Sequence, residues 1–320
     1  MNDVFTLQWH ITHRCNLRCR HCYQDDFSSL FPTEDFPKIL DGFEALLQKE
    51  GCAGHVNVTG GEPLTHPGLF TLLHSLGERG LTFSLLTNGT LIGKSEARLL
   101  KELGVSYVQV SLDGTEKVHD RIRGEGAFDA ALRGLGALLC EDVDATVAFT
   151  AQRDNLRELP KLARLLRGVG VKKLWYDRVV IPASEDEAGL SLSPTQAQRL
   201  MKKGASLQRR FPVTNGRALQ FLAAGRNCTY SCQAGKRLLA LLANGTVYPC
   251  RRLPLEVGNA LETPLDVLFE TSPLLKTLRA AGAPEGCRGC QWEETCKGGA
   301  KCVAFAKTGR WDEKDPDCPL

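Results

Sequence analysis

The chain has 320 residues, a net charge of +3 and 42% hydrophobic residues, enough apolar material for one large domain and a smaller one. The nearly balanced charge gives no sign of binding to nucleic acid or to an acidic membrane surface. The amino terminus has no basic segment followed by an apolar one, and no apolar run reaches the roughly 18 residues that a bilayer span needs. The sequence therefore predicts a soluble, cytoplasmic protein.

Strand and helix patterns alternate over the first two thirds of the chain. Strands rich in β-branched and aromatic residues are predicted at 5–12, 55–59, 81–87, 106–111, 145–150 and 171–176. The spacing of apolar residues predicts helices at 35–50, 69–76, 94–103, 127–139, 156–166 and 194–210. Such alternation implies parallel strands joined by crossover helices. Because six units are too few for a closed eight-stranded barrel, we expect an α/β fold with a partial (βα)6 TIM-like barrel.

Three cysteines lie within eight residues, directly after the first predicted strand. Cys15, Cys19 and Cys22 have the spacing C-x3-C-x2-C, so their thiolates can bind one metal centre. A four-iron cluster held by three thiolates keeps one iron open. Zinc would need a fourth ligand, which His13 or His21 could provide. The spacing favours a cluster, and zinc stays open as the alternative.

Residues suited to ligand binding follow the second, third and fourth predicted strands, and they are Gly60, Gly61, Glu62, Asn88, Ser111 and Asp113. The two glycines let the backbone come close to a ligand, and Glu62 can accept hydrogen bonds from an ammonium group. Taken alone, each of these segments is equally well an ordinary solvated turn. Because βα folds bind ligands at the carboxyl ends of their strands, a common binding site is favoured.

Eight of the 13 cysteines lie in the last hundred residues, and they are Cys228, Cys232, Cys250, Cys287, Cys290, Cys296, Cys302 and Cys318. All seven histidines lie at or before His119, so a metal site in this region must be built from thiolates alone. Eight thiolates make two four-cysteine sites, which suit zinc ions or iron–sulfur clusters. Asn244-Gly245 between two apolar runs predicts a β-hairpin with a type I′ turn.

These motifs, in this order, resemble the radical S-adenosylmethionine (SAM) enzymes. Cys15, Cys19 and Cys22 match the CxxxCxxC signature of that family, with His21 in place of the usual aromatic residue. Residues 60–62 match its GGE motif. The resemblance implies the same partial barrel that the alternation of strands and helices predicts.

The C-terminal cysteines resemble the SPASM extension of this family. Twelve residues separate Cys232 from Gly245 and four separate Gly245 from Cys250, similar to the C-x9-15-G-x4-C opening of SPASM. We therefore predict a radical SAM partial barrel at 1–215 and a small, cysteine-rich SPASM domain with a β-hairpin at 216–320.

The resemblance implies SAM and three [4Fe–4S] clusters as cofactors. One cluster would be held by Cys15, Cys19 and Cys22 and would bind SAM at its open iron. Contacts to SAM are then expected from Gly60, Gly61, Glu62, Asn88, Ser111, Asp113 and Arg123. Arg123 would pair with the SAM carboxylate, although an ordinary surface arginine is an equal alternative. Arg178, after the sixth strand, could face either SAM or the substrate.

The resemblance also implies how the eight C-terminal thiolates divide. The first auxiliary cluster would take Cys228, Cys232, Cys250 and Cys302, and the second would take Cys287, Cys290, Cys296 and Cys318. Five residues separate Cys296 from Cys302, where the family usually has three, so Cys302 would have to come from the first turn of a helix. This departure makes Cys302 the weakest ligand assignment and leaves open whether the first auxiliary cluster has a free iron.

The activity that the resemblance implies is reductive cleavage of SAM to a 5′-deoxyadenosyl radical, which abstracts hydrogen from a ribosomally made peptide and forms a crosslink or an oxidised side chain. Cys52 and Cys140 lie where a helix meets the next strand, far from the strand-end motifs, so no spare thiol serves the hydrogen donation of an epimerase. One alternative is modification of a tetrapyrrole side chain. An alternative of another class is a zinc-ribbon binding module on an inactive barrel.

The expected partners follow from the same resemblance. The first is a peptide substrate, and flavodoxin or ferredoxin would donate electrons. Because the first predicted strand starts close to residue 1, a separate leader-binding protein or the SPASM surface would have to read a leader. Neither nucleic acid nor a membrane is expected as a partner.

Overall fold

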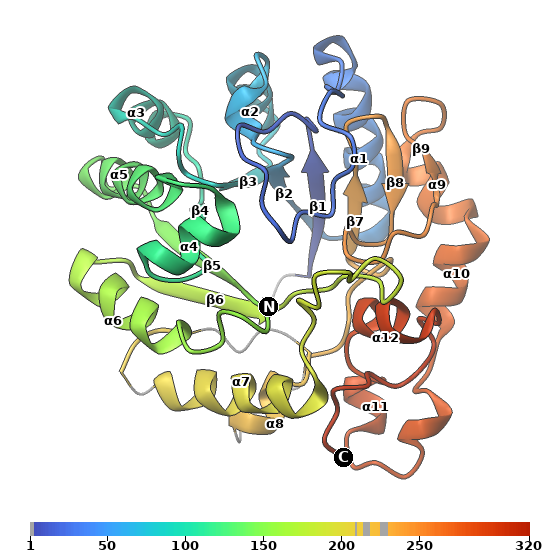
Figure 1. The fold of residues 1–320 in the computed structure, drawn as a ribbon. Coiled ribbons are helices and arrows are strands. Elements are labelled where there is room, and N and C mark those ends of the chain that lie inside the picture. Colours follow the sequence, from blue (N-terminus) through green and yellow to red (C-terminus); the bar gives the residue numbers. More distant parts are fainter. Residues whose placement is uncertain (1–2, 209, 214–217, 225–229) are drawn as a thin grey trace.

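The computed structural model describes residues 3–208, 210–213, 218–224 and 230–320. One sheet organises this described part of the chain, with nine strands in the order β6-β5-β4-β3-β2-β1-β7-β8-β9. Six of them form the parallel barrel strands, namely β1 (Val4–His10), β2 (Ala53–Thr59), β3 (Thr82–Thr87), β4 (Val108–Ser111), β5 (Ala145–Ala151) and β6 (Lys173–Arg178). The sheet curves without closing (Figure 1), as a partial barrel should.

Helices cover the outer face of this curved sheet (Figure 1). The crossover helices are α1 (Phe36–Glu50), α2 (Leu69–Glu78), α3 (Lys94–Glu102), α5 (Ala127–Cys140), α6 (Leu159–Val169) and α7 (Pro194–Leu207). The predicted partial (βα)6 barrel of the α/β class is therefore confirmed. Helix α4 (Glu116–Arg123) was not predicted, β6 begins and ends two residues later than expected, and the bounds of several other elements differ by two or three residues.

The remaining elements complete the chain. Short 3-10 turns lie at η1 (Thr33–Asp35), η2 (Pro63–Thr65) and η3 (Glu285–Cys287). The C-terminal part contains α8 (Gln220–Ala224), β7 (Leu238–Leu241), β8 (Thr246–Tyr248), β9 (Gly258–Asn259), α9 (Leu265–Thr271), α10 (Pro273–Ala280), α11 (Glu293–Cys296) and α12 (Lys301–Thr308). Within the described ranges, no helix is long and apolar enough to cross a bilayer.

Strand β1 illustrates how the sequence separates the core from the cavity. Successive side chains of a strand point to opposite faces. Phe5, Leu7 and Trp9 are fully buried, and the ring of Phe5 packs edge-on against Phe43 of α1 at 6.1 Å between centroids. Gln8, on the opposite face, lines the cavity inside the barrel. The barrel interior is lined by polar residues such as Gln109 and Ser111 together with apolar ones such as Leu86 and Trp175.

The predicted hairpin is present, but its turn differs from the prediction. Strands β7 and β8 pair antiparallel, and β7 also pairs in parallel with β1, which was not predicted. The type I′ turn is wrong, because Gly245 has a φ of 84° whereas Asn244 has no positive φ. Since β7 joins β1, the sheet runs continuously past residue 215, and the division into two domains stays a prediction.

Candidate active site

A broad cavity with about 1420 Å³ of space between its walls opens at the carboxyl ends of the barrel strands. The loop that carries Cys15, Cys19 and Cys22 forms one side of it. The same cavity is lined by Gly60, Gly61, Asn88, Ser111 and Arg123. The structure thus brings the three cysteines together with five of the seven residues predicted to contact SAM. The other two, Glu62 and Asp113, are fully buried beneath the cavity wall.

The two glycines after β2 allow this strand end to lie directly against the cysteine loop. The Gly61 N–H donates to the carbonyl oxygen of Thr12 at 2.7 Å. A Cβ on Gly60 would come within 2.4 Å of that oxygen, and a Cβ on Gly61 would come within 2.3 Å of the carbonyl oxygen of Arg14. Any larger residue at either position would push the cysteine loop away. Both glycines are therefore needed for packing of the loop, in addition to any approach to a ligand.

Glu62 joins the ends of β2 and β3 from inside the protein. Its carboxylate accepts hydrogen bonds from the Thr87 hydroxyl at 2.7 Å, the Asn88 N–H at 2.8 Å and the Leu64 N–H at 3.2 Å. Burial raises the pKa of Glu62 to about 7, although these hydrogen bonds oppose the rise. The carboxylate thereby fixes Asn88 at the cavity wall. Direct contact between Glu62 and the ammonium group of SAM stays a prediction.

Asn88 lies against the cysteine loop. Its side-chain amide donates to Oδ1 of Asn16 at 2.9 Å and lies 3.9 Å from the Cys15 sulfur. Ser111, the last residue of β4, lines the cavity on the other side. A hydroxyl and an amide at neighbouring strand ends can hydrogen-bond the polar groups of a bound nucleoside.

Arg123 and Asp113 form a buried ion pair next to Cys19. The Arg123 Nε donates to the Asp113 carboxylate at 2.6 Å, and its Nη1 lies 3.8 Å from the Cys19 sulfur. Although burial opposes ionisation, the Arg123 guanidinium keeps the pKa of Asp113 below its usual range. Asp113 also accepts from the Thr150 N–H at 2.8 Å. The pair presents the guanidinium to both the thiol and the cavity, while Asp113 itself stays behind the wall.

His21, which the sequence marked as a possible zinc ligand and as a departure from the family signature, lines the cavity. Burial lowers its pKa to about 4, so the imidazole is neutral at pH 7. Its Nδ1 lies 3.1 Å from the side-chain amide of Gln152. A neutral, fixed ring in the cavity wall can pack against a planar ligand.

Two further arginines line the cavity, and the sequence did not reveal their partners. Arg178, expected to face SAM or substrate, lines the cavity and also bonds to Asp315 and Asp317 with N–O distances of 2.7 to 3.0 Å. Arg252 pairs with Asp177 at 2.5 Å. Because these partners are distant in sequence, no local pattern could have identified the pairs.

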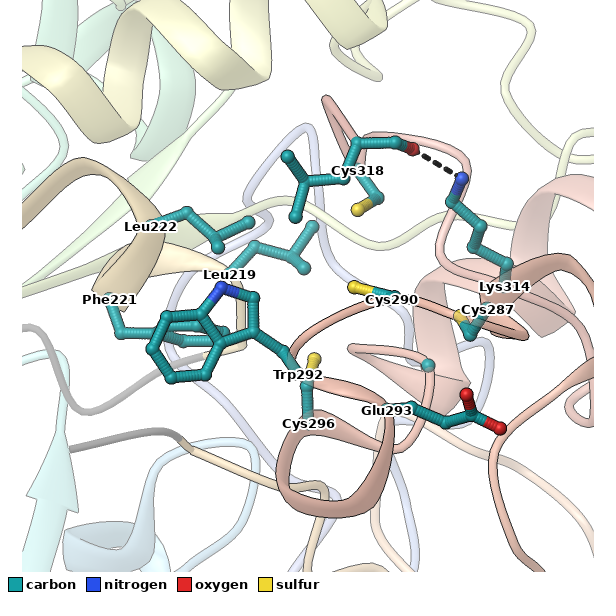
Figure 2. Close-up of a pocket in the computed structure, with 12 residues that line it drawn as sticks. Leu219, Phe221, Leu222, Cys287, Cys290, Trp292, Glu293, Cys296, Lys314 and Cys318 are labelled. Atoms are coloured by element: carbon teal, nitrogen blue, oxygen red, sulfur yellow. Dashed lines mark hydrogen bonds between the residues drawn. The ribbon is translucent and has the colours of Figure 1, made fainter. Parts of the chain in front are cut away.

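Four C-terminal cysteines line a second, small pocket (Figure 2), and these are Cys287, Cys290, Cys296 and Cys318. One wall is apolar, because Trp292 packs edge-on against Phe221 of α8 with ring centroids 5.3 Å apart. Burial raises the pKa of Cys296 to about 11. Such a thiol is neutral at pH 7 unless a metal replaces its proton. The four thiols and their largely dry surroundings suit an iron–sulfur cluster.

A second group contains Cys232, Cys250 and Cys302. Burial, together with the neighbouring thiols of Cys250 and Cys232, raises the pKa of Cys302 to about 12, although the Arg252 guanidinium opposes the rise. Cys302 lies in the first turn of α12, as predicted. Cys228, the fourth predicted member, lies outside the described residues. In the described part of the chain no three His, Cys, Asp or Glu side chains are arranged to hold a single metal ion.

Comparison with known proteins identifies the family. The model of the radical SAM superfamily matches residues 9–174, and the model of SPASM, an iron–sulfur cluster-binding domain, matches residues 232–291. The chain is 27% identical over 339 residues to an AdoMet-dependent heme synthase of Methanosarcina barkeri, covering 98% of this chain and 95% of that protein. It is 28% identical over 332 residues to the mycofactocin maturase MftC of Mycobacterium ulcerans, covering 98% of this chain and 87% of that protein.

Among solved structures, the fold is similar to that of Streptococcus suis SuiB bound to S-adenosylmethionine. The TM-score is 0.81 at 17% identity, with 100% of this chain and 78% of that chain covered. The superfamily match spans just over half of the chain, from the strand before the cysteine loop into β6. This protein therefore belongs to the radical SAM superfamily and carries a C-terminal SPASM domain.

Proposed function

We propose that this radical SAM enzyme cleaves SAM reductively and uses the resulting 5′-deoxyadenosyl radical to take a hydrogen atom from a ribosomally made peptide, which then forms a crosslink or an oxidised side chain. The observation that carries the proposal is the single cavity that contains the three thiols of the CxxxCxxC loop together with Asn88, Ser111 and Arg123. A four-iron cluster on these thiols supplies the electron that breaks the sulfonium bond.

The residues around the cysteine loop hold and orient both groups. Burial raises the pKa of Cys19, and the Arg123 guanidinium opposes that rise, so Arg123 favours the thiolate needed for iron binding. The glycines after β2 fix the loop from below. Asn88, Ser111 and Arg123 offer an amide, a hydroxyl and a guanidinium to the polar groups of SAM.

We propose that the protein holds three clusters, the second and third in the C-terminal part. The match to an iron–sulfur domain favours clusters over the zinc-ribbon alternative. The cavity between Cys287, Cys290, Cys296 and Cys318 supports one complete site. Cys232, Cys250 and Cys302 support the other, with Cys228 as its predicted fourth ligand.

A peptide is favoured over a tetrapyrrole by the charges in the cavity wall. Tetrapyrrole precursors carry several carboxylates, which need unpaired cations for binding. In the described residues, three arginines line the cavity; Arg178 and Arg252 are held by Asp315/Asp317 and Asp177, and Arg123, paired with Asp113, is already assigned to SAM, which leaves none of the three for a substrate carboxylate. The tetrapyrrole alternative is kept as a second candidate because the heme synthase relative spans 98% of the chain.

The partners of this activity belong to the same proposal. SuiB has also been solved bound to its precursor peptide, SuiA, which supports a peptide substrate here. A flavodoxin or ferredoxin would donate electrons, and a separate leader-binding protein would present a leader peptide.

The first test is to measure iron, zinc and sulfide on anaerobically purified protein, followed by incubation with SAM and dithionite. We expect roughly twelve irons per chain, from three four-iron clusters, and release of 5′-deoxyadenosine. Zinc in place of iron, with no cleavage of SAM, would contradict the proposal.

The second test separates the two substrate classes. A panel of precursor peptides and an iron–coproporphyrin are offered in deuterated form, and deuterium transfer into 5′-deoxyadenosine is measured. Transfer from a peptide alone supports the proposal, whereas transfer from the porphyrin alone selects the second candidate.

A further inference from the structure

Arg178 connects the active-site cavity to the C-terminal cysteines through a buried salt-bridge network. It is the last residue of β6 and is one of the residues that line the cavity. Nη1 and Nη2 donate to the two oxygens of Asp315 at 3.0 and 2.9 Å, and Nη1 also donates to Asp317 at 2.7 Å. All three side chains are at least 96% buried, because their exposed fractions are 4%, 0% and 1%.

Asp315 in turn holds the segment between Cys296 and Cys302. Its carboxylate accepts from the N–H of Ala300, the residue before α12, at 3.1 Å. Its own N–H donates to the carbonyl oxygen of Gly298 at 2.8 Å. A Cβ on Gly299 would lie 2.7 Å from the Cβ of Asp315, so the turn packs directly on this aspartate.

This turn is the place where the sequence departs from the SPASM spacing. The backbone φ angles are positive at three successive residues, 52° at Lys297, 92° at Gly298 and 83° at Gly299. Residues other than glycine rarely adopt this conformation. Three successive residues of this kind reverse the chain sharply. This reversal accommodates the two residues by which the spacing between Cys296 and Cys302 exceeds that of the family. Helix α12 can then start at a position from which Cys302 reaches Cys250 and Cys232.

The same network fixes the last cysteine. The Cys318 N–H donates to the Asp315 carbonyl oxygen at 2.9 Å, and the Asp317 N–H donates to the Asp315 carboxylate at 3.0 Å. Lys307 of α12 donates to Asp317 at 2.6 Å. One arginine in the cavity wall therefore anchors the segments that carry one cysteine of each auxiliary group.

We propose that Arg178 is a positioning residue that, through Asp315 and Asp317, sets Cys302 and Cys318 in place for the two auxiliary clusters and joins them to the substrate side of the barrel. This role rests on the proposed function of the C-terminal cysteines as cluster ligands. The planar guanidinium is suited to it, because it bonds one carboxylate through two N–H groups and a second carboxylate at the same time.

The test uses the anaerobically purified holoprotein and three variants. Arg178→Met removes the guanidinium and leaves the buried carboxylates of Asp315 and Asp317 without their arginine partner. Arg178→Lys keeps the charge but cannot form the paired bonds to Asp315. The triple variant Arg178→Met/Asp315→Asn/Asp317→Asn removes the buried charges together with the anchor. Arg79→Met is the control. Arg79 also bridges two carboxylates, but its partners Asp41 and Glu44 belong to helix α1 and not to the cysteine-rich segments.

We expect Arg178→Met and the triple variant to lose about four to eight of roughly twelve irons per chain, from one or both auxiliary clusters. The SAM-binding cluster and its electron paramagnetic resonance signal should remain. Hydrogen exchange of residues 297–303 and 315–319 should become at least about tenfold faster, whereas strands β1–β5 and the Arg79→Met control should not change. Arg178→Lys should fall between wild type and Arg178→Met.

Three results would overturn the inference. The first two are wild-type iron content in Arg178→Met and an equal loss of iron from all three clusters. The third is full recovery of iron content in the triple variant, which would mean that Arg178 only neutralises buried charge. Failure of the wild type itself to bind iron would contradict the proposed function instead. Exchange of the two segments would then still report whether Arg178 holds them.

Discussion

The guanidinium of Arg251 lies 4.1 Å from the centre of the Tyr23 ring, and its Nη2 donates to the Tyr23 carbonyl oxygen at 3.3 Å. Tyr23 follows Cys22 of the N-terminal cysteine loop, and Arg251 follows Cys250 of the C-terminal group that also contains Cys232 and Cys302. A single cation–π contact therefore joins two cysteine-bearing segments that are 228 positions apart in sequence. It holds the segment around Cys250 beside the cavity that is lined by Cys15, Cys19 and Cys22.

Replacing Tyr23 by Leu should loosen this connection. A cation–π pair at a half-exposed site contributes about 0.5–1 kcal/mol, and Tyr23 is 50% exposed. We expect the apparent melting temperature to fall by only about 1 °C at a fixed scan rate, because the unfolding entropy of a chain this long is large. Tyr23→Phe keeps the aromatic ring and is the control, which should stay within about 0.3 °C of wild type in replicate scans. An equal loss in both variants would show that the hydroxyl, and not the ring, matters.

Cys19→Ala should abolish SAM cleavage and leave the auxiliary clusters in place. The variant removes one of three thiols in the cavity, and two thiolates hold a four-iron cluster poorly. We expect no 5′-deoxyadenosine and a loss of roughly four irons per chain. Cys140→Ala is the control, since Cys140 is exposed at the end of α5. Continued cleavage of SAM by Cys19→Ala would remove this loop from the active site.

The local pattern of residues predicted the barrel and the cysteine loop, because each strand, each helix and the CxxxCxxC spacing depends on residues that are close together in the sequence. It also predicted that Gly60, Gly61, Asn88 and Ser111 lie on one face, since the carboxyl ends of parallel strands share an edge, whereas Arg123 reaches that face from helix α4, which was not predicted. It could not predict that Asp113 lies behind Arg123, because burial depends on how the chain packs and not on which residue type is present.

For the same reason, the sequence could not predict ion pairs and strand pairs between residues that are far apart in the chain. Nothing near Arg178 indicates Asp315 as its partner, and the pairing of β7 with β1 joins segments more than two hundred residues apart. The hairpin turn was mispredicted because Asn-Gly favours a two-residue loop. Here the loop spans residues 242–245, and the Gly245 N–H donates to the carbonyl oxygen of Leu242 at 2.9 Å.

Glu62 should make stability depend on pH in a predictable direction. Its pKa is about 7 in the folded protein and 4.5 in an unperturbed chain. Between these values the folded state holds a proton that the unfolded state has lost, so the free energy of unfolding falls as the pH rises from about 4.5 to about 7. Above that range the contribution of Glu62 is constant.

Glu62→Gln should remove this decline, because an amide stays neutral at every pH. The melting temperature of Glu62→Gln minus that of wild type, measured from pH 5 to pH 8, should increase with pH. Taking the difference cancels the other titrating groups. A difference that is flat, or that decreases with pH, would mean that the three hydrogen bonds to Glu62 outweigh its burial and keep the carboxylate ionised throughout.

Cys302 decides whether the first auxiliary cluster is fully ligated. Burial raises its pKa to about 12, so in the absence of iron its thiol is neutral and inert at pH 7. Because the 297–299 turn brings it to Cys232 and Cys250, we expect Cys302→Ala to lose roughly four of twelve irons. Cys318→Ala should cause an equal loss but from the other site, and Cys52→Ala should cause none. If Cys302→Ala keeps its iron and its spectrum, the first auxiliary cluster has an iron without a protein ligand. That iron would then be available to bind the substrate, and the role of the turn would be to shape the cavity around it.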